Sequence, residues 1–267
     1  MNSYVCITGA TGGLGKAFAV ECASRGWNLY LTDISETSLA VLAESLKNTY
    51  GVNIKYNQCD LTDFCSRTEL FKKIEEQGLS FWFLINIAGL DYEGLFSERT
   101  REQITRMLRL NIEGNLEMTY SILKSRDTSR TFRVLNVCSL AAFYPMPVKA
   151  MYSSSKRFLF NFSMALREEL RHTGGTVTAL CPSGMPTTLE CIRAIDAQGF
   201  AGRITTKNVG FVAARAIGHA LKGHPVYIPG VLNKILRFAG GLVPQTLTAH
   251  LIGNRWFSAS CAMTNTR

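Results

Sequence analysis

Apolar segments of strand length alternate with longer segments of helical periodicity along most of this 267-residue chain. Residues 81–87 (FWFLINI) are apolar throughout, as expected of a strand buried on both faces of a sheet. Strands separated by helices need crossover connections, which produce a parallel sheet covered by helices on both faces. The predicted strands are 4–8, 28–32, 52–58, 81–87, 132–138, 176–180 and 226–228, and the predicted helices are 14–25, 36–50, 63–77, 99–124, 151–172 and 205–222.

The same pattern predicts one domain. There is no internal repeat, low-complexity segment or linker, so residues 1–230 are expected to fold together. Residues 182–204 interrupt the alternation with two prolines and three glycines, and we expect a flap there. Residues 231–267 are apolar, basic and interrupted by glycine, and we expect an extension of helices that packs on the same domain.

The net charge of +9 is concentrated at the end of the chain. Eight lysines and arginines follow Asp196 and no acidic residue does, so the rest of the chain is almost neutral. A solvated basic face explains this distribution. A more specific alternative is a surface that binds an anionic substrate, an acidic carrier protein or membrane headgroups. Binding to headgroups would bring the protein into peripheral contact with a membrane. Nucleic acid is disfavoured because no recognition motif accompanies the charge.

Localisation signals are scarce. Strand-like residues begin at Tyr4 without a charged segment before them, and no apolar run reaches the roughly 18 residues of a membrane span. The eight cysteines have neither CxxC spacing nor metal-ligand spacing with histidine. We therefore expect a cytoplasmic protein in a reducing compartment, with no disulfide framework and no metal site.

A glycine-rich turn at residues 8–15 (TGATGGLG) joins the first predicted strand to the first predicted helix. Glycines let the backbone turn tightly and approach a ligand, and the helix start offers free N–H groups to a pyrophosphate. The spacing G-x3-G-x-G differs from the common G-x-G-x-x-G, and a glycine turn alone is a weak signal. The candidate cofactor contacts here are Gly9, Thr11, Gly12, Gly13, Leu14 and Gly15.

Asp33 ends the second predicted strand, where a carboxylate can accept hydrogen bonds from ribose hydroxyls and would repel a 2′-phosphate. No lysine or arginine adjoins it, which favours NAD over NADP; the alternative is a solvated aspartate that starts a turn. Asp60 and Leu61 after the third strand, and Asn86, Ala88 and Gly89 after the fourth, fall at the same edge of the sheet. Asp60 has the alternative role of a helix N-cap.

Tyr152 and Lys156 share one face of a predicted helix, because they are four residues apart. A nearby ammonium group favours the phenolate and lowers the tyrosine pKa from its ordinary value of about 10, so that Tyr152 can exchange a proton with a substrate oxygen. Ser139 follows a predicted strand and can orient that oxygen, or simply cap a turn. Asn111 lies inside a predicted helix, where asparagine is a poor former and structural roles are common.

Taken in order, these segments resemble the short-chain dehydrogenase/reductase family over about residues 4–230. The turn 8–15 is similar to its TGxxxGxG motif, and residues 86–89 to its NNAG motif with Ile87 in place of the second asparagine. Residues 181–184 (CPSG) resemble its PG segment with Ser183 inserted. The family's catalytic tetrad falls on Asn111, Ser139, Tyr152 and Lys156.

This resemblance implies a single-domain Rossmann-type α/β fold, a doubly wound parallel sheet that binds a nicotinamide dinucleotide. Tyr152 would be the acid/base, Lys156 would bind the nicotinamide ribose and lower the tyrosine pKa, Ser139 would orient the carbonyl, and Asn111 would hold a water. Pro182, Gly184 and Thr187 (or Thr188) would meet the nicotinamide. A homodimer or homotetramer built on helices 99–124 and 151–172 is also implied.

One branch of the family is similar at residues 141–147 (AAFYPMP) and 228–230. It contains hydroxysteroid and bile-acid dehydrogenases and long-chain 3-oxoacyl reductases. Many members have an arginine after the second strand and use NADP; Asp33 departs from this, so NAD remains our prediction.

The substrate is expected to be a hydrophobic alcohol or ketone, first a steroid or bile-acid hydroxyl group, because apolar side chains would line its cavity. A carrier- or CoA-linked 3-oxoacyl substrate is the alternative, and a non-catalytic dinucleotide-binding sensor is a third interpretation. The candidate substrate contacts are Ser139, Phe143, Tyr144, Met146, Tyr152 and Met185.

Overall fold

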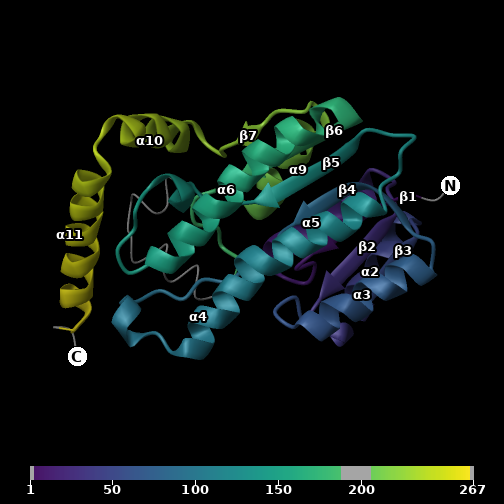
Figure 1. Ribbon diagram of the computed structural model, residues 1–267, viewed down its shortest axis with the longest axis horizontal. Helices are drawn as coiled ribbons and strands as arrows, with labels where there is room; N and C mark the ends of the chain where they lie inside the picture. Colours follow the sequence, from purple (N-terminus) through teal and green to yellow (C-terminus); the bar gives the residue numbers. More distant parts are fainter. Residues whose placement is uncertain (1–2, 188–205, 265–267) are drawn as a thin grey trace.

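The computed structural model describes residues 3–187 and 206–264, with side chains described as far as Asn254 in the last helix. A parallel sheet of seven strands in the order β3-β2-β1-β4-β5-β6-β7 forms its centre (Figure 1). The predicted single parallel sheet is confirmed. Its strands are β1 (Ser3–Thr8), β2 (Leu29–Asp33), β3 (Ile54–Gln58), β4 (Ser80–Asn86), β5 (Phe132–Val137), β6 (Gly175–Leu180) and β7 (Val226–Tyr227).

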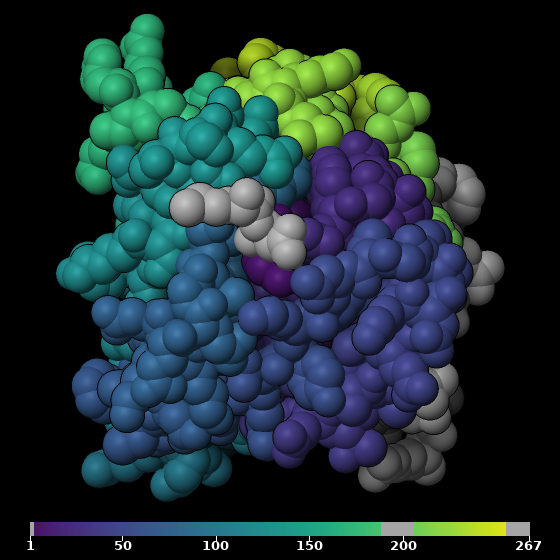
Figure 2. All heavy atoms as spheres, turned by 90° about the vertical axis from the view of Figure 1, so that its right-hand side faces the viewer, coloured from purple at the N-terminus to yellow at the C-terminus, as the bar shows by residue number. Residues whose placement is uncertain are grey.

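The chain winds outward from β1 in both directions, so the strand order reverses between β1 and β4. Thr8 pairs with Thr32 on one side and with Asn86 on the other, which brings the carboxyl ends of β1, β2 and β4 to one level. Ligands of such sheets bind beyond the carboxyl ends at this point of reversal. Figure 2 views the opposite end of the molecule, where the chain begins.

Helices cover both faces of the sheet. α1 (Gly13–Ser24), α2 (Glu36–Tyr50) and α9 (Val209–Leu221) pack on one face, and α3 (Phe64–Glu76), α5 (Asn115–Lys124) and α6 (Ala150–Leu170) on the other. In β1, Val5 and Ile7 join the first core cluster, whereas Tyr4 and Cys6 join the second. This alternation along a wholly buried strand explains why its sequence shows no polar face.

Four helices of the described chain begin at polar residues whose side chains cap the first turn. Ser35, Asp63 and Asn208 accept hydrogen bonds from backbone N–H groups in the first turns of α2, α3 and α9. Thr100 and Gln103 form a reciprocal capping box at the start of α4 (Arg101–Leu108). Short 3-10 segments occur at Phe96–Glu98, Leu140–Phe143 and Arg171–Thr173.

The predicted long helix 99–124 is interrupted. Residues Arg109–Gly114 form a π-helical segment between α4 and α5, and Asn111 lies in it. The Asn115 side chain donates to the carbonyl oxygens of Leu110 (2.9 Å) and Asn111 (3.2 Å), which satisfies groups that the wider turn displaces. Such segments often mark functional sites.

Two helices end the described chain, α10 (Val231–Leu242) and α11 (Gln245–Thr264). α10 packs beside the 3-10 segment Leu140–Phe143, while α11 projects along the side of the molecule (Figure 1). No helix in the described part of the chain combines the length and apolar character needed to cross a membrane.

Candidate active site

The glycine-rich turn lies between β1 and α1 at the carboxyl edge of the sheet. Gly9 has a φ of +63°, and a Cβ at Gly15 would lie 2.0 Å from the Gly9 carbonyl oxygen. Gly12 is the N-cap of α1 and offers no side-chain cap, while Leu14 is buried below the turn. A Cβ at Gly15 would overlap the backbone of the turn, so this glycine lets the start of α1 pack closely against it. We call the turn and this helix start, with its free N–H groups, the glycine cradle.

Asp33 lies beside this cradle at the end of β2. Its Oδ2 accepts a hydrogen bond from the Thr11 backbone N–H (2.9 Å), and its Oδ1 accepts one from the Ile34 N–H (2.7 Å). A carboxylate can accept about four hydrogen bonds, so both oxygens keep capacity for ribose hydroxyls. The following residues, Ile34 to Glu36, supply no positive charge for a 2′-phosphate.

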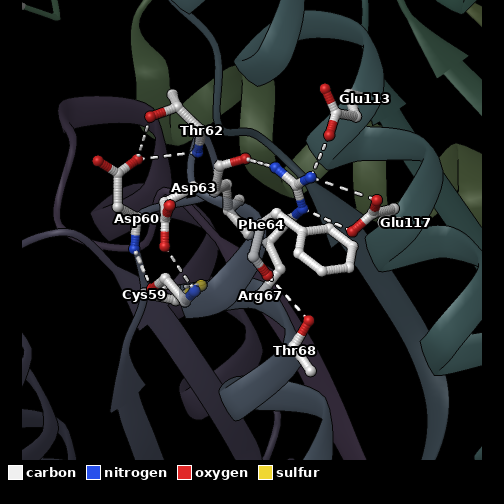
Figure 3. Close-up of polar contacts among 11 residues, drawn as sticks. Cys59, Asp60, Thr62, Asp63, Phe64, Arg67, Thr68, Glu113 and Glu117 are labelled. Carbon is white, nitrogen blue, oxygen red and sulfur yellow. Dashed lines mark hydrogen bonds and ion pairs between the residues drawn. The ribbon is translucent and has the colours of Figure 1, made fainter.

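The Asp60–Leu61 turn lies at the same edge (Figure 3). Asp60 Oδ1 accepts hydrogen bonds from the backbone N–H and the hydroxyl of Thr62, at 2.8 and 2.7 Å. Asp63 caps α3 by accepting the Ser66 N–H at 2.7 Å. The alternative role of Asp60 as the cap of this helix is therefore wrong, because that position belongs to Asp63.

A buried arginine holds this turn from below. Arg67 of α3 is fully buried and donates from Nη1 to the Leu61 carbonyl oxygen at 2.7 Å. The same guanidinium is paired with Glu113 of the π-helical segment and with Glu117 of α5, the latter at 2.5 Å from Nε (Figure 3). The turn after β3 and the helix containing Asn111 are thus tied to one side chain.

Residues 86–89 follow β4 across from the glycine turn. Thr8 Oγ1 accepts the backbone N–H groups of Ile87 and Ala88, at 3.0 and 3.2 Å. The Asn86 side chain turns inward and donates to Thr119 and Asn136, at 3.0 Å each. A Cβ at Gly89 would lie 3.1 Å from Lys156 Nζ and 3.2 Å from Asn111 Oδ1, so this glycine keeps space between the two.

Asn111 is fully buried and fixed by three groups. Its amide donates to the Leu90 carbonyl oxygen (2.9 Å) and to Ser155 Oγ (3.1 Å), and its Oδ1 accepts the Leu90 N–H (2.9 Å). Lys156, also buried, donates from Nζ to the Val137 carbonyl oxygen at 2.9 Å. The π-helical turn therefore aims a polar side chain at the start of α6.

Tyr152 and Ser139 meet at the carboxyl end of β5. Ser139 is close enough to lower the pKa of Tyr152, and Ser139 Oγ accepts the Ala141 N–H at 3.1 Å, so Ser139 caps a turn as well. The Tyr152 ring centroid lies 5.8 Å from Lys156 Nζ. The structure thus brings all four predicted tetrad residues to one edge of the sheet.

Burial dominates the electrostatics of this group. Burial and the negative charge of Asp91 raise the pKa of Tyr152, and Ser139 and Lys149 lower it, with a net value of about 12. The expectation from the sequence that this pKa lies below its ordinary value is therefore wrong. Burial also lowers the pKa of Lys156. A phenol with a raised pKa holds its proton at neutral pH, which suits a proton donor to a carbonyl oxygen.

The segment after β6 passes next to the glycine-rich turn, with Thr187 against Gly13. The Pro182 carbonyl oxygen accepts the Leu140 N–H at 2.7 Å, which ties this segment to the Ser139 turn. A Cβ at Gly13 would lie 2.8 Å from the Thr187 carbonyl oxygen, so Thr187 sits directly against the cradle. Gly184 is exposed beside it. Most of the predicted flap, with Thr188, lies outside the described residues.

Several of the predicted substrate contacts are already packed against other parts of the protein. Phe143 packs against Phe160 (centroids 4.9 Å apart) and under the Arg237 guanidinium (4.8 Å). The Tyr144 ring lies where a Cβ at Gly240 would be, 2.1 Å from that position. Met146 is partly buried in the same loop, whereas Met185 packs against the first core cluster.

The family model described as short chain dehydrogenase matches residues 3–193. The chain belongs to the short-chain dehydrogenase family. The resemblance stated from the sequence is therefore confirmed, and among the described residues no cluster of three potential metal ligands is found.

Curated relatives indicate the branch. The chain is 32% identical over 192 residues to 17-beta-hydroxysteroid dehydrogenase type 3 of Mus musculus, covering 70% of this chain and 61% of that protein. It is 31% identical over 199 residues to very-long-chain 3-oxoacyl-CoA reductase-A of Danio rerio, covering 72% and 61%. The chain thus spans about three fifths of the length of these relatives.

Solved structures of the family share the fold. A short-chain dehydrogenase from Sphingobium yanoikuyae in complex with NADPH has a TM-score of 0.77 and 25% identity, covering 91% of this chain and 97% of that one. A 7beta-hydroxysteroid dehydrogenase has a TM-score of 0.84 at 23% identity, covering 94% and 96%. The latter likeness supports the fold alone.

Three charged residues near the site were not predicted from the sequence. Arg67 and Lys149 find their partners 46 to 58 residues away along the chain, and no local pattern marks such pairs. Arg237 appeared only as one charge of the basic tail, but its side chain lies over Phe143.

Proposed function

We propose that this short-chain dehydrogenase is an NAD(H)-dependent oxidoreductase for the secondary alcohol or ketone of a hydrophobic substrate, of the steroid or bile-acid class. The supporting observation is the assembly of Asn111, Ser139, Tyr152 and Lys156 beside a glycine cradle at the carboxyl edge of the sheet. Hydride transfer is the chemistry that the bound nicotinamide supplies.

The chain's own residues would supply position and protons. Ser139 and Tyr152 would both hydrogen-bond the substrate oxygen, and Tyr152 would donate its proton as a ketone is reduced or accept one as an alcohol is oxidised. Lys156 would bind the nicotinamide ribose. Asn111, fixed by Leu90 and Ser155, would hold a water on the route from Lys156 to solvent.

Several residues fit the dinucleotide. The cradle and the helix start suit the pyrophosphate, and Asp33 suits the adenosine ribose. The Asp60–Leu61 turn and Ala88–Gly89 would flank the adenosine, while Asn86 would support that wall from inside. Pro182, Gly184 and Thr187 would face the nicotinamide.

The deciding experiment is a fluorescence titration of the purified protein with NADH and with NADPH, followed by turnover of hydrophobic alcohols. Tighter binding of NADH, with oxidation of a hydroxysteroid that Tyr152→Phe abolishes, would support the proposal. Tighter binding of NADPH would refute the cofactor assignment, and full function in Tyr152→Phe would favour a non-catalytic sensor.

A 3-oxoacyl-CoA reductase is the second candidate, favoured by the similarity to very-long-chain 3-oxoacyl-CoA reductases. The exposed cations Lys234 and Arg237 on α10 would suit the phosphates of CoA. Reduction of a long-chain 3-oxoacyl-CoA with little hydroxysteroid turnover would select this function.

Two kinds of association also belong to the proposal. A homodimer or homotetramer is supported by exposed apolar side chains on the helices expected to pair, with Leu108 on α4, Tyr120 on α5 and Phe158 on α6. Peripheral contact with a membrane is supported by the outward face of α10, where Val231, Ile235, Phe238 and Leu242 are exposed.

A further inference from the structure

Two lysines lie near the Tyr152 ring, one at the N-cap of α6 and one within the helix. Lys156 Nζ is 5.8 Å from the ring centroid, and Lys149 Nζ is also 5.8 Å from it. Lys156 is anchored inward on the Val137 carbonyl oxygen, whereas Lys149 lies three residues before Tyr152 at the N-cap of α6. The proposed function assigns a role to Lys156 only.

Lys149 is held by two carboxylates from the loop that follows β4. Its Nζ lies 2.6 Å from Asp91 Oδ2 and 2.9 Å from Glu93 Oε2. The Lys149 and Asp91 side chains are 19% and 27% exposed, so this pair is poorly screened by solvent. Burial alone would lower the pKa of Lys149, but the two carboxylates outweigh it and hold this pKa above its ordinary value.

The backbone next to Lys149 is strained in a way that fixes this geometry. Val148 has a φ of +60°, the one positive value for a non-glycine in the described part of the chain. This conformation is disfavoured for a β-branched residue, so surrounding contacts must maintain it. The Val148 carbonyl oxygen accepts the Gly94 N–H at 2.8 Å, which clamps the same loop that contains Asp91 and Glu93.

Asn111 of the π-helical segment binds the same loop near its start. The Asn111 side chain binds both the N–H and the carbonyl oxygen of Leu90, one residue before Asp91. A continuous set of contacts therefore runs from Asn111 through Leu90 and Asp91 to Lys149 and the Tyr152 ring. The loop therefore links two members of the tetrad, Asn111 and Tyr152, through Leu90, Asp91 and Lys149.

We propose that Lys149, anchored by Asp91 and Glu93, is a second positioning lysine that fixes the outer side of Tyr152 and sets the charge felt by its hydroxyl. This inference rests on the proposed role of Tyr152 as the acid/base. Lys149 contacts Tyr152 rather than the reacting atoms, so it acts through that residue.

The expected signs follow from the groups that face Tyr152. Among the described residues these are Asp91 of the loop after β4, Cys138 at the end of β5, and Lys149 and Lys156 of α6. The positive charge of Lys149 lowers the Tyr152 pKa, and the negative charge of Asp91 raises it. Loss of each charge must therefore move the Tyr152 pKa in opposite directions.

The test is the pH profile of alcohol oxidation at saturating NAD for Lys149→Met, Lys149→Arg and Asp91→Asn. Oxidation needs Tyr152 deprotonated, so Lys149→Met should move the acidic limb about one pH unit upward and Asp91→Asn downward by a similar amount. Lys149→Arg keeps the charge and should restore the wild-type limb. Lys72→Met, at an exposed pair on α3, is the control and should leave the profile unchanged.

A second readout does not depend on turnover. The absorbance of the Tyr152 phenolate can be titrated as the difference between each protein and the same protein with Tyr152→Phe. Opposite shifts for Lys149→Met and Asp91→Asn support the inference even if no substrate is found, whereas a coinciding titration in all variants overturns it. An inactive wild-type protein with shifted titrations would refute the proposed function alone, and a parallel fall in Tm without any shift would reduce Lys149 to a structural role.

Discussion

Asp33 shows at the residue scale how one carboxylate can serve both fold and cofactor choice. It accepts the Thr11 N–H and so fixes the glycine turn against β2, while its remaining lone pairs would be available to the adenosine ribose under the proposed function. We expect Asp33→Asn to weaken NADH binding by about 10- to 100-fold, the loss of one or two charge-assisted hydrogen bonds. NADPH binding should weaken less, because a repulsive charge is removed with them.

Fluorescence titration of both cofactors measures this change. Asp127→Asn is a suitable control, since Asp127 binds Ser129 in an exposed turn at the opposite end of the sheet. Equal losses for NADH and NADPH would mean that Asp33 only supports the turn, and the choice of NAD would then rest on other residues.

The Tyr152 hydroxyl can be tested separately from the rest of its side chain. Tyr152→Phe retains the ring between its neighbours and removes only the hydroxyl, so NADH affinity should be nearly unchanged while kcat falls by about 10²- to 10⁴-fold. Stopped-flow measurement of hydride transfer separates the chemical step from cofactor binding. A loss of less than about tenfold would be below the usual contribution of an acid/base residue and would contradict this role.

Residues differ in how well their roles can be predicted from sequence. The glycine turn and the Tyr152–Lys156 pair are local patterns, because the spacing along one turn or one helix face places the groups together. The positions of Asn86 and Met185 were foreseen but not their directions, since Asn86 turns toward Thr119 and Asn136 and Met185 toward the core. Such directions depend on packing between distant segments.

At the scale of the element, the strands were predicted closely and the helix containing Asn111 was not. Hydrophobic periodicity locates buried strands well, but it does not distinguish an α-helix from one widened by a single π turn. The widening here depends on Asn115 and on Gly114, whose Cβ position lies 2.9 Å from the Leu61 carbonyl oxygen. That contact joins segments about fifty residues apart and leaves no local signal.

Arg67 should stabilise this junction. Arg67→Met keeps much of the side-chain volume but leaves the Leu61 carbonyl oxygen and the two carboxylates without their partner. Breaking a buried pair costs about 3–5 kcal/mol, and we expect about 2–4 kcal/mol because Glu113 and Glu117 remain partly exposed and can be resolvated. Urea unfolding measures this loss, and NADH affinity should fall with it because the Asp60–Leu61 turn is released.

The matched control for Arg67 is Arg25→Met on α1, which breaks an exposed pair with Glu21 at 2.6 Å. Exposed pairs contribute about 0–1 kcal/mol, so this variant should unfold at nearly the wild-type urea concentration. If both arginine variants lose the same small amount, the buried network is not a support of the π-helical segment.

The C-terminal helix α10 reverses the usual arrangement of an amphipathic helix. Its inner side presents Asn233, which is buried and donates to the Pro229 carbonyl oxygen (2.7 Å) and Ser183 Oγ (3.1 Å), and Gly240, which packs against Tyr144. Val231, Ile235, Phe238 and Leu242 share the opposite side, with 57–74% of their surface exposed. The prediction that the extension packs on the domain thus describes one side of α10 and not its apolar one.

For the whole molecule, this apolar face and the positive charge lie in the same part of the chain. α10 also presents Lys234 and Arg237, and no acidic residue follows Asp196. An apolar stripe flanked by cations is the pattern of a helix that lies in the headgroup region of an anionic membrane. Since α10 also contacts Phe143 and Tyr144, a hydrophobic substrate dissolved in the lipid would meet the protein close to its site.

We therefore expect the protein to cosediment with vesicles containing anionic phosphatidylglycerol and much less with neutral phosphatidylcholine vesicles, because both apolar burial and charge attraction contribute. Phe238→Ser with Leu242→Ser should abolish the binding, since each removes a mostly exposed apolar side chain from the stripe. Val41→Ser on α2, a comparably exposed apolar site elsewhere, should leave it intact. Should the double variant instead convert a dimer to a monomer in sedimentation velocity without altering vesicle binding, the stripe is covered by a second copy of the chain and the membrane assignment is wrong.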